Sequence, residues 1–106
     1  MAEVLTIEEL RERIDKVDQQ LVQLLNVRVA CAVEIGRLKH DEGLPVYQPQ
    51  REAQVLERVR QSATTLAGPL TAEAVVRIFE RIIDEARRAE RHAGEREDTL
   101  DSRIGE

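Results

Sequence analysis

Aromatic residues and cysteine are scarce in this 106-residue sequence, which has no tryptophan, one tyrosine, one phenylalanine and one cysteine. A lone cysteine excludes an intrachain disulfide, and the position of Cys31 on an apolar seam predicts a buried free thiol. His40 and His92 stand at different predicted helix ends without cysteines or carboxylates at ligand spacing, so we expect no metal site. A sequence poor in aromatics but rich in Ala, Leu, Glu and Arg is typical of helices rather than strands.

Long apolar runs and an excess of basic residues are also missing. No stretch approaches the ~20 apolar residues that span a bilayer, and MAEVLTIEEL at the start has neither the basic nor the apolar region of a secretory signal. A formal net charge of −5 argues against a nonspecific nucleic-acid surface. We therefore expect a cytoplasmic, single-domain protein that binds neither membranes nor nucleic acid.

The first predicted helix is long. Thr6 and Glu9 have the spacing of a capping box, and an apolar seam then continues without proline until a turn signal at Gly43, which gives about 33 helical residues. At ~1.5 Å per residue this helix is ~50 Å long, whereas a compact domain of this size is only ~33 Å across. The seam would extend into water in a single chain, so we expect a second copy to pack along it. The seam positions are Leu10, Ile14, Val17, Leu21, Leu24, Arg28, Cys31, Ile35 and Leu38.

Two further helices complete an all-α fold with one very long, one short and one medium helix. Pro49 suits the first position of the short helix, which we expect to end near Ser62. Thr71 is a suitable N-cap for the third. The periodicity is lost in HAGEREDTLDSRIGE, which predicts a domain of residues 1–92 and a polar, disordered tail of residues 93–106.

Arg28 is the unusual member of the seam. An unpaired cation among apolar residues is costly, so Arg28 requires either a carboxylate partner or an anionic ligand. Asp18, Glu34 and Glu52 are the available carboxylates. The seam considered alone favours such an ion pair.

Other charged residues could join Arg28 in a site. Lys39 lies about three turns further on nearly the same face, ~16 Å away, so the two side chains could converge on one small anion. Arg11 is ~25 Å from Arg28 in the opposite direction and could approach only from a second, antiparallel copy of the helix. Considered singly, Arg11 and Arg51 are typical of solvated surface residues. Glu90 continues the apolar stripe of the third helix, although alone it is typical of a solvated helix end.

Four segments together resemble the all-helical (AroQ) class of chorismate mutases over residues 5–92. They are LRERIDKVDQQLVQLLNVR, EIGRLK, GLPVYQPQRE and IFERIIDEARRAE. The resemblance implies an intertwined homodimer whose long helices pair antiparallel. It also implies an isomerase of phenylalanine and tyrosine biosynthesis that rearranges chorismate to prephenate without a cofactor, a metal or a nucleophile.

The resemblance assigns roles to the cations. Arg28 and Arg11 of the partner subunit would grip the two carboxylates of chorismate, for which bidentate guanidinium geometry is suited. Lys39 would donate to the ether oxygen, where negative charge gathers as the C–O bond breaks. Arg51 would add to the positive field of the site.

The remaining substrate-binding positions also follow from the resemblance. Glu52 would accept a hydrogen bond from the ring hydroxyl with help from the backbone of Gln48, and Ile35 and Ile83 would form apolar walls. Gln48 stands where the family often has Asp, which matters little for a main-chain contact.

Two further positions on the third helix depart from the family pattern. Ala86 replaces a common Ser, which removes one donor to a carboxylate. Glu90 replaces a common Gln, although some members carry Glu there. As a carboxylate it would repel the developing oxyanion, so we expect Glu90 to have a raised pKa and to act in its protonated form, with turnover falling as the pH rises.

Two other functions are compatible with this pattern. An isochorismate pyruvate-lyase resembles the same fold and also surrounds a dianionic enolpyruvyl ether with cations, but GLPVYQPQRE is more similar to the mutases. A noncatalytic helical module that senses chorismate or prephenate is the second alternative. Whether a partner enzyme of the aromatic pathway tunes the activity stays open at this point.

Overall fold

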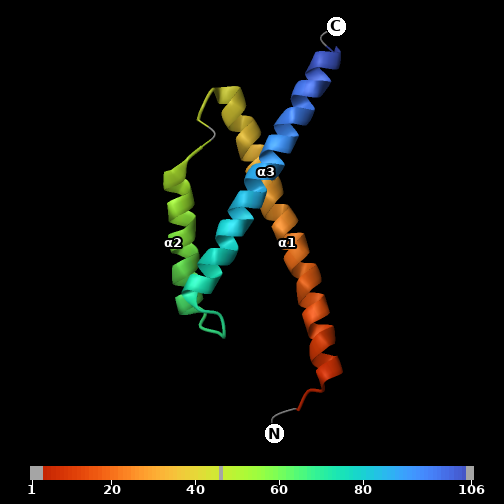
Figure 1. The fold of residues 1–106 in the computed structure, drawn as a ribbon, viewed down its shortest axis with the longest axis vertical. Helices are drawn as coiled ribbons and strands as arrows, with labels where there is room; N and C mark the ends of the chain where they lie inside the picture. Colours follow the sequence, from red (N-terminus) through yellow and green to blue (C-terminus); the bar gives the residue numbers. More distant parts are fainter. Residues whose placement is uncertain (1–3, 46, 105–106) are drawn as a thin grey trace.

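The protein consists of three α-helices and the loops that join them. The computed structural model describes the backbone of residues 4–45 and 47–104 and the side chains as far as residue 96. The helices are α1 (Ile7–Glu42), α2 (Pro49–Thr65) and α3 (Ala72–Ile104), and no strand occurs in the described part. The predicted all-α fold is therefore confirmed (Figure 1). None of the helices in the described residues is both long and apolar enough to cross a bilayer.

The ends of α1 are fixed by local hydrogen bonds. The Glu9 N–H donates to the Thr6 hydroxyl oxygen and the Thr6 N–H donates to the Glu9 carboxylate, both at 3.1 Å, which confirms the capping box. At the other end Gly43 has φ 71°, in the left-handed region, and the Leu44 N–H donates to the Lys39 carbonyl at 2.8 Å. These caps make α1 36 residues long, slightly longer than predicted.

The helix α3 connects the other two. It crosses α1 as one arm of an X and runs beside α2, whereas α1 and α2 pack only against α3 within the described residues (Figure 1). The Thr71 hydroxyl accepts the Ala74 N–H at 3.0 Å, so the predicted N-cap of α3 is confirmed. The short helix α2 ends at Thr65, one turn later than predicted. Any site built from α1 and α2 must therefore also include α3.

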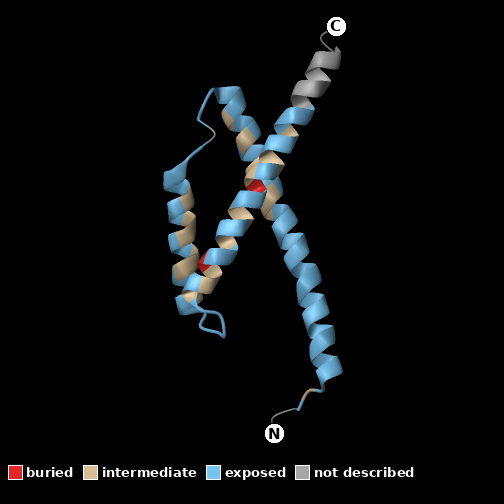
Figure 2. Cartoon of the chain, viewed as in Figure 1, coloured by how far each residue is buried: buried red, intermediate tan, exposed pale blue. Residues whose placement is uncertain are grey.

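The N-terminal half of α1 projects away from the other helices (Figure 1), and its residues are exposed among the described part of the chain. Every residue from Thr6 to Val27 is exposed, as Figure 2 shows for the free arm of α1. The molecule measures 70 × 30 × 16 Å with a radius of gyration of 18.8 Å, whereas a compact domain of this length would have ~13 Å. Its accessible surface is 9146 Å², and a compact monomer of this mass would expose only ~6,000 Å². A large apolar surface on α1 is thus uncovered.

The predicted burial of Cys31 is wrong for the single chain, because its thiol is exposed. The reason is the direction from which α3 approaches. The α1 residues that α3 half-buries include Val29, Ala32 and Val33, which lie beside the seam rather than on it. Cys31 therefore stays on the uncovered face together with the leucines of the seam.

Residues 93–104, for which the sequence predicts a polar, disordered tail, continue α3 as a helix. A helix needs no apolar stripe to continue where it projects into solvent, provided that no proline interrupts its hydrogen bonds. The segment contains no proline, and Gly94 is the residue in it that disfavours the helix most. Residues 105 and 106 lie outside the described part of the chain.

Replacing Gly43 by alanine should lower the free energy of unfolding by about 1 kcal/mol, because a Cβ is strained at φ 71°. Gly94→Ala is the matched comparison, because Gly94 lies inside α3 in open space. That change should raise the free energy of unfolding by up to ~1 kcal/mol. Urea unfolding followed by circular dichroism at one protein concentration measures both, and effects of the same sign would contradict the left-handed cap.

Candidate functional site

Three of the predicted site residues meet where α3 passes between α1 and the start of α2. Lys39 comes from the last turn of α1, Glu52 from the first turn of α2, and Glu90 from α3. All three side chains are half-buried, and the charges of Lys39 and Glu52 both act on Glu90. The fold therefore joins residues that are up to 51 positions apart in the sequence.

Glu90 occupies the crossing of α1 and α3. A Cβ on Gly36 would lie 3.6 Å from the Glu90 Oε2 atom, so the glycine lets α1 approach this carboxyl closely. Burial raises the pKa of Glu90; the positive charges of Lys39 and Arg87 oppose this effect, and the negative charge of Glu52 adds to it. The carboxyl therefore holds its proton to a higher pH than an ordinary glutamate, as the sequence predicted.

Arg28 lies on the same side of α1 and is half-buried against α3. Its guanidinium carbon is 5.9 Å from the centre of the Phe79 ring, a cation–π contact. Two of the three carboxylates considered as its partners are engaged elsewhere, since Glu34 pairs with Arg37 and Glu52 pairs with Arg87. The third, Asp18, lies ten residues before Arg28 on the uncovered half of α1. Within the described residues no carboxylate pairs with Arg28, which leaves its donors available for an anionic ligand.

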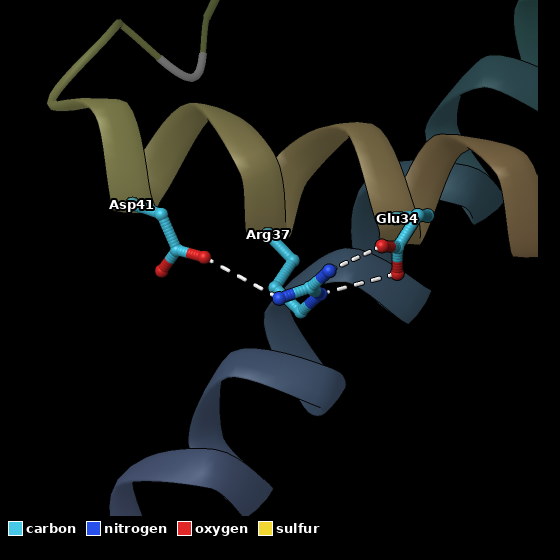
Figure 3. Close-up of polar contacts among 3 residues, drawn as sticks. All are labelled: Glu34, Arg37 and Asp41. Atoms are coloured by element: carbon cyan, nitrogen blue, oxygen red, sulfur yellow. Dashed lines mark hydrogen bonds and ion pairs between the residues drawn. The ribbon is translucent and has the colours of Figure 1, made fainter.

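The partner of Glu34 belongs to a small network on the surface of α1. Arg37 donates to Glu34 through Nε at 3.2 Å and to Asp41 through Nη1 at 3.3 Å, so one guanidinium joins two turns of the helix (Figure 3). The hydrogen bond from Arg37 lowers the pKa of Glu34. This arrangement favours the ionised form of Glu34 and engages both of its carboxylate oxygens with Arg37.

Arg87 is a site residue that sequence reasoning missed. It forms an ion pair with Glu52 across α2 and α3, contacts Asp84 at 3.3 Å, and lies over the Tyr47 ring at 5.8 Å from its centre. The hydrogen bond with Glu52 is the main cause that raises the pKa of Arg87. Its spacing from Ile83 (four residues) and Glu90 (three residues) could have revealed it, because these intervals place all three on one helical face.

The other predicted positions surround this group to different extents. Ala86 is buried, with 4% of its surface exposed, and Ile83 is half-buried. Gln48 and Arg51 are exposed beside Glu52 in the first turn of α2, and Ile35 is 52% exposed on α1. In the single chain, therefore, Ile83 and Ala86 of α3 form the apolar lining of the site, and Ile35 on α1 is exposed to solvent.

Arg11 stands apart from all of these residues. It lies in the uncovered half of α1, ~25 Å along the helix axis from Arg28. A side chain cannot reach across that distance, so Arg11 does not reach the site of its own chain. The sequence predicts the same, because it lets Arg11 approach Arg28 only from a second copy of the helix.

The assembled groups are suited to a small organic anion with polar substituents. Arg28 and Lys39 provide positive charge, Glu90 provides a carboxyl that can donate when protonated, and Glu52 provides a hydrogen-bond acceptor. Among the described residues no group of three or more His, Cys, Asp or Glu side chains could hold a metal ion. These side chains are suited to binding and orienting such an anion and to stabilising charge that develops on it.

Comparisons with known proteins identify relatives of this chain. The family model for "Chorismate mutase type II" matches residues 10–91. The chain is 36% identical over 78 residues to the bifunctional chorismate mutase/prephenate dehydratase of Aquifex aeolicus, covering 73% of this chain and 22% of that protein. It is 35% identical over 85 residues to the T-protein of Enterobacter agglomerans, covering 80% of this chain and 22% of that protein. The chain thus spans about a fifth of the length of these curated relatives.

A solved structure shows the same likeness over almost its whole length. The chorismate mutase of Thermus thermophilus (form II) is 32% identical in sequence and superimposes with a TM-score of 0.74. The match covers 80% of this chain and 93% of that one.

Glu90→Gln should change how stability depends on pH. The folded protein binds the Glu90 proton more tightly than the unfolded chain does, so this group makes the free energy of unfolding fall as the pH rises from 4.5 to the raised pKa. Glutamine does not titrate, so the variant should gain stability relative to the wild type over that window. Urea midpoints across acidic and neutral pH measure this, with the exposed Glu80→Gln as control. A constant difference at every pH would contradict the raised pKa.

Proposed function

This chain belongs to the chorismate mutase type II family, and we propose that it rearranges chorismate to prephenate. In this Claisen rearrangement the ether C–O bond breaks as a new C–C bond forms within one molecule, so no co-reactant is consumed. The observation that carries the proposal is that Lys39, Glu52 and Glu90 come together from three helices, while Arg28, on the same side of α1 as Lys39, has no carboxylate partner among the described residues. We assign the activity to residues 1–92 and the protein to the cytoplasm.

The reaction requires the substrate to be held in a folded, chair-like conformation. Arg28 and Arg11 of the partner subunit would each bind one carboxylate, which fixes the two ends of the dianion. Ile35, Ile83 and the buried Ala86 would enclose the ring between apolar surfaces. Fixing the reacting carbons near each other removes much of the entropic part of the barrier.

Stabilising the negative charge that develops on the ether oxygen would lower the activation barrier further. Lys39 and protonated Glu90 are the donors for this oxygen, since both come from the crossing of α1 and α3. Their hydrogen bonds strengthen as negative charge develops, so they favour the transition state over the substrate. Ionised Glu90 would lose its donor and repel that charge.

The first turn of α2 would bind the opposite side of the substrate ring. Glu52 accepts the ring hydroxyl with the backbone of Gln48, and Arg51 contributes positive field. Glu52 is half-buried next to Glu90, whereas Arg51 remains exposed. This part of the site recognises the substrate rather than stabilising the breaking bond.

We further propose that two chains form an antiparallel homodimer through α1. Exposed apolar residues on this helix extend from Ile7 to Leu38, so the middle of the stripe lies near Val22. A two-fold axis at Val22 would place Arg11 opposite residue 33, between Arg28 and Lys39 of the partner subunit. The ~3,000 Å² of surface that each chain exposes beyond a compact monomer is on the scale that extensive obligate interfaces bury.

The prephenate formed would pass to an enzyme that consumes it. In the Aquifex relative, one protein is named for both the chorismate mutase and the prephenate dehydratase activities. An enzyme of the aromatic pathway that takes prephenate as its substrate is therefore the partner class that we propose for this chain.

Purified protein should consume chorismate with saturation kinetics and produce prephenate. Lys39→Ala should lower kcat/KM by roughly 10²–10³-fold, the usual cost of removing a donor to a developing oxyanion. The exposed Arg81→Ala is the control for a lost surface charge. Pyruvate release from isochorismate would instead identify a lyase, and chorismate binding without turnover would identify a sensing module. Either result would overturn the proposed reaction.

Mixing two inactive homodimers should restore activity if Arg11 is borrowed from the partner subunit. A hybrid of Arg11→Ala and Arg28→Ala chains carries both lesions in one pocket and neither in the other. After complete subunit exchange, half of the dimers are hybrids with one intact site each, so about a quarter of wild-type activity is expected. Exchange can be verified with chains of different mass, and no recovery despite exchange would exclude the shared site.

A further inference from the structure

We propose that Arg87 is a positioning residue that holds the first turn of α2, and with it Glu52, against the site. The inference rests on the proposed function, because Glu52 is assigned there to the ring hydroxyl of chorismate.

Arg87 contacts three segments that meet at the site. Its guanidinium pairs with Glu52 on α2, touches Asp84 on its own helix, and lies over Tyr47 in the loop that follows α1. The Glu52 side chain in this pair is only 25% exposed. One side chain thus links the end of the loop and the start of α2 to the face of α3 that carries Ile83 and Glu90.

The start of α2 has little support of its own. Gln48 is the N-cap residue but makes no capping hydrogen bond with its side chain, and Pro49 follows without an N–H. The direction of this turn therefore depends on tertiary contacts. Because Gln48, Arg51 and Glu52 all lie on this turn, a small rotation would displace all three relative to Lys39 and Glu90.

The geometry of the pair leaves part of Glu52 available. Arg87 Nη2 donates to Oε1 of Glu52, so Oε2 can still accept a hydrogen bond from a substrate hydroxyl. Held in this way, Glu52 offers one fixed oxygen to the substrate instead of two mobile ones.

Arg87 also offsets charge at Glu90. The groups that face Glu90 are Lys39 from α1, Glu52 from α2 and Arg87 on α3. The positive charges of Lys39 and Arg87 lower the pKa of Glu90, and the charge of Glu52 raises it. Without Arg87, the Glu90 proton would be retained to a higher pH.

The chain offers a matched control at the other end of α2. Arg60 pairs with Glu73 at 3.0 Å, which is also an ion pair between α2 and α3. Glu52 and Arg60 are eight residues apart, ~12 Å along the helix, so the second pair lies away from the site. Arg60→Leu removes a pair of the same kind and reports the effect of loosening α2 alone.

Arg87→Leu should raise KM for chorismate roughly tenfold and change kcat less than about twofold, because the Glu52 contact exists in both the bound substrate and the transition state. The alkaline limb of the kcat profile should move to higher pH. Arg87→Lys should recover part of the KM loss, and Arg60→Leu should change neither KM nor the pH limb.

A double-mutant cycle tests whether Arg87 acts through Glu52. Arg87→Leu combined with Glu52→Gln should have the KM of Glu52→Gln alone, because the arginine then has no carboxylate to position. Additive losses, or equal KM changes in Arg87→Leu and Arg60→Leu, would overturn the inference. Should Arg87→Leu fail to fold, the same cycle with Arg87→Lys gives the answer. A wild-type protein inactive on chorismate would refute the proposed function itself, whereas normal wild-type activity with unchanged Arg87→Leu kinetics would refute only the role of Arg87.

Discussion

The structure depends on one imbalance, because α1 presents more apolar surface than the rest of the chain can cover. Its 36 residues extend for ~54 Å, and α3 crosses only the C-terminal half. The part that α3 covers carries Arg28 and Lys39, and the uncovered part carries Arg11. The same imbalance therefore exposes the surface proposed for dimerisation and divides the predicted cations between two places.

The distribution of ion pairs determines which charges remain available. Arg37 binds Glu34 and Arg87 binds Glu52, so two of the carboxylates that could have paired with Arg28 are engaged in other ion pairs. Arg28 lies over Phe79 instead, a contact that leaves its hydrogen-bond donors unused. An enzyme for a dianion needs such a cation, because a guanidinium already paired with a protein carboxylate would have to release it before binding substrate.

Glu90 shows how one substitution in a site alters its electrostatics. Its carboxyl lies against the backbone at Gly36 and between charges of both signs. Burial and Glu52 favour the proton, while Lys39 and Arg87 disfavour it. The balance keeps a carboxylic acid able to donate a hydrogen bond over part of the acidic range, a role that an amide would fill at any pH.

The sequence by itself determined the three helices and the caps of α1 and α3, and its resemblance to a known family supplied most residues of the proposed site. Capping boxes, glycine turns and apolar periodicity depend on interactions within a few residues, so Thr6, Gly43 and Thr71 were correctly assigned. The tertiary structure decided which face of α1 is covered, which exposed Cys31, and which carboxylates on other helices Arg60 and Arg87 bind. Those outcomes depend on how helices distant in sequence approach one another, and for this reason the ion pair of Arg87 with Glu52 became visible only in three dimensions. Residues 93–104 continue α3 beyond its apolar stripe, because the loss of such a stripe removes packing without breaking helical hydrogen bonds.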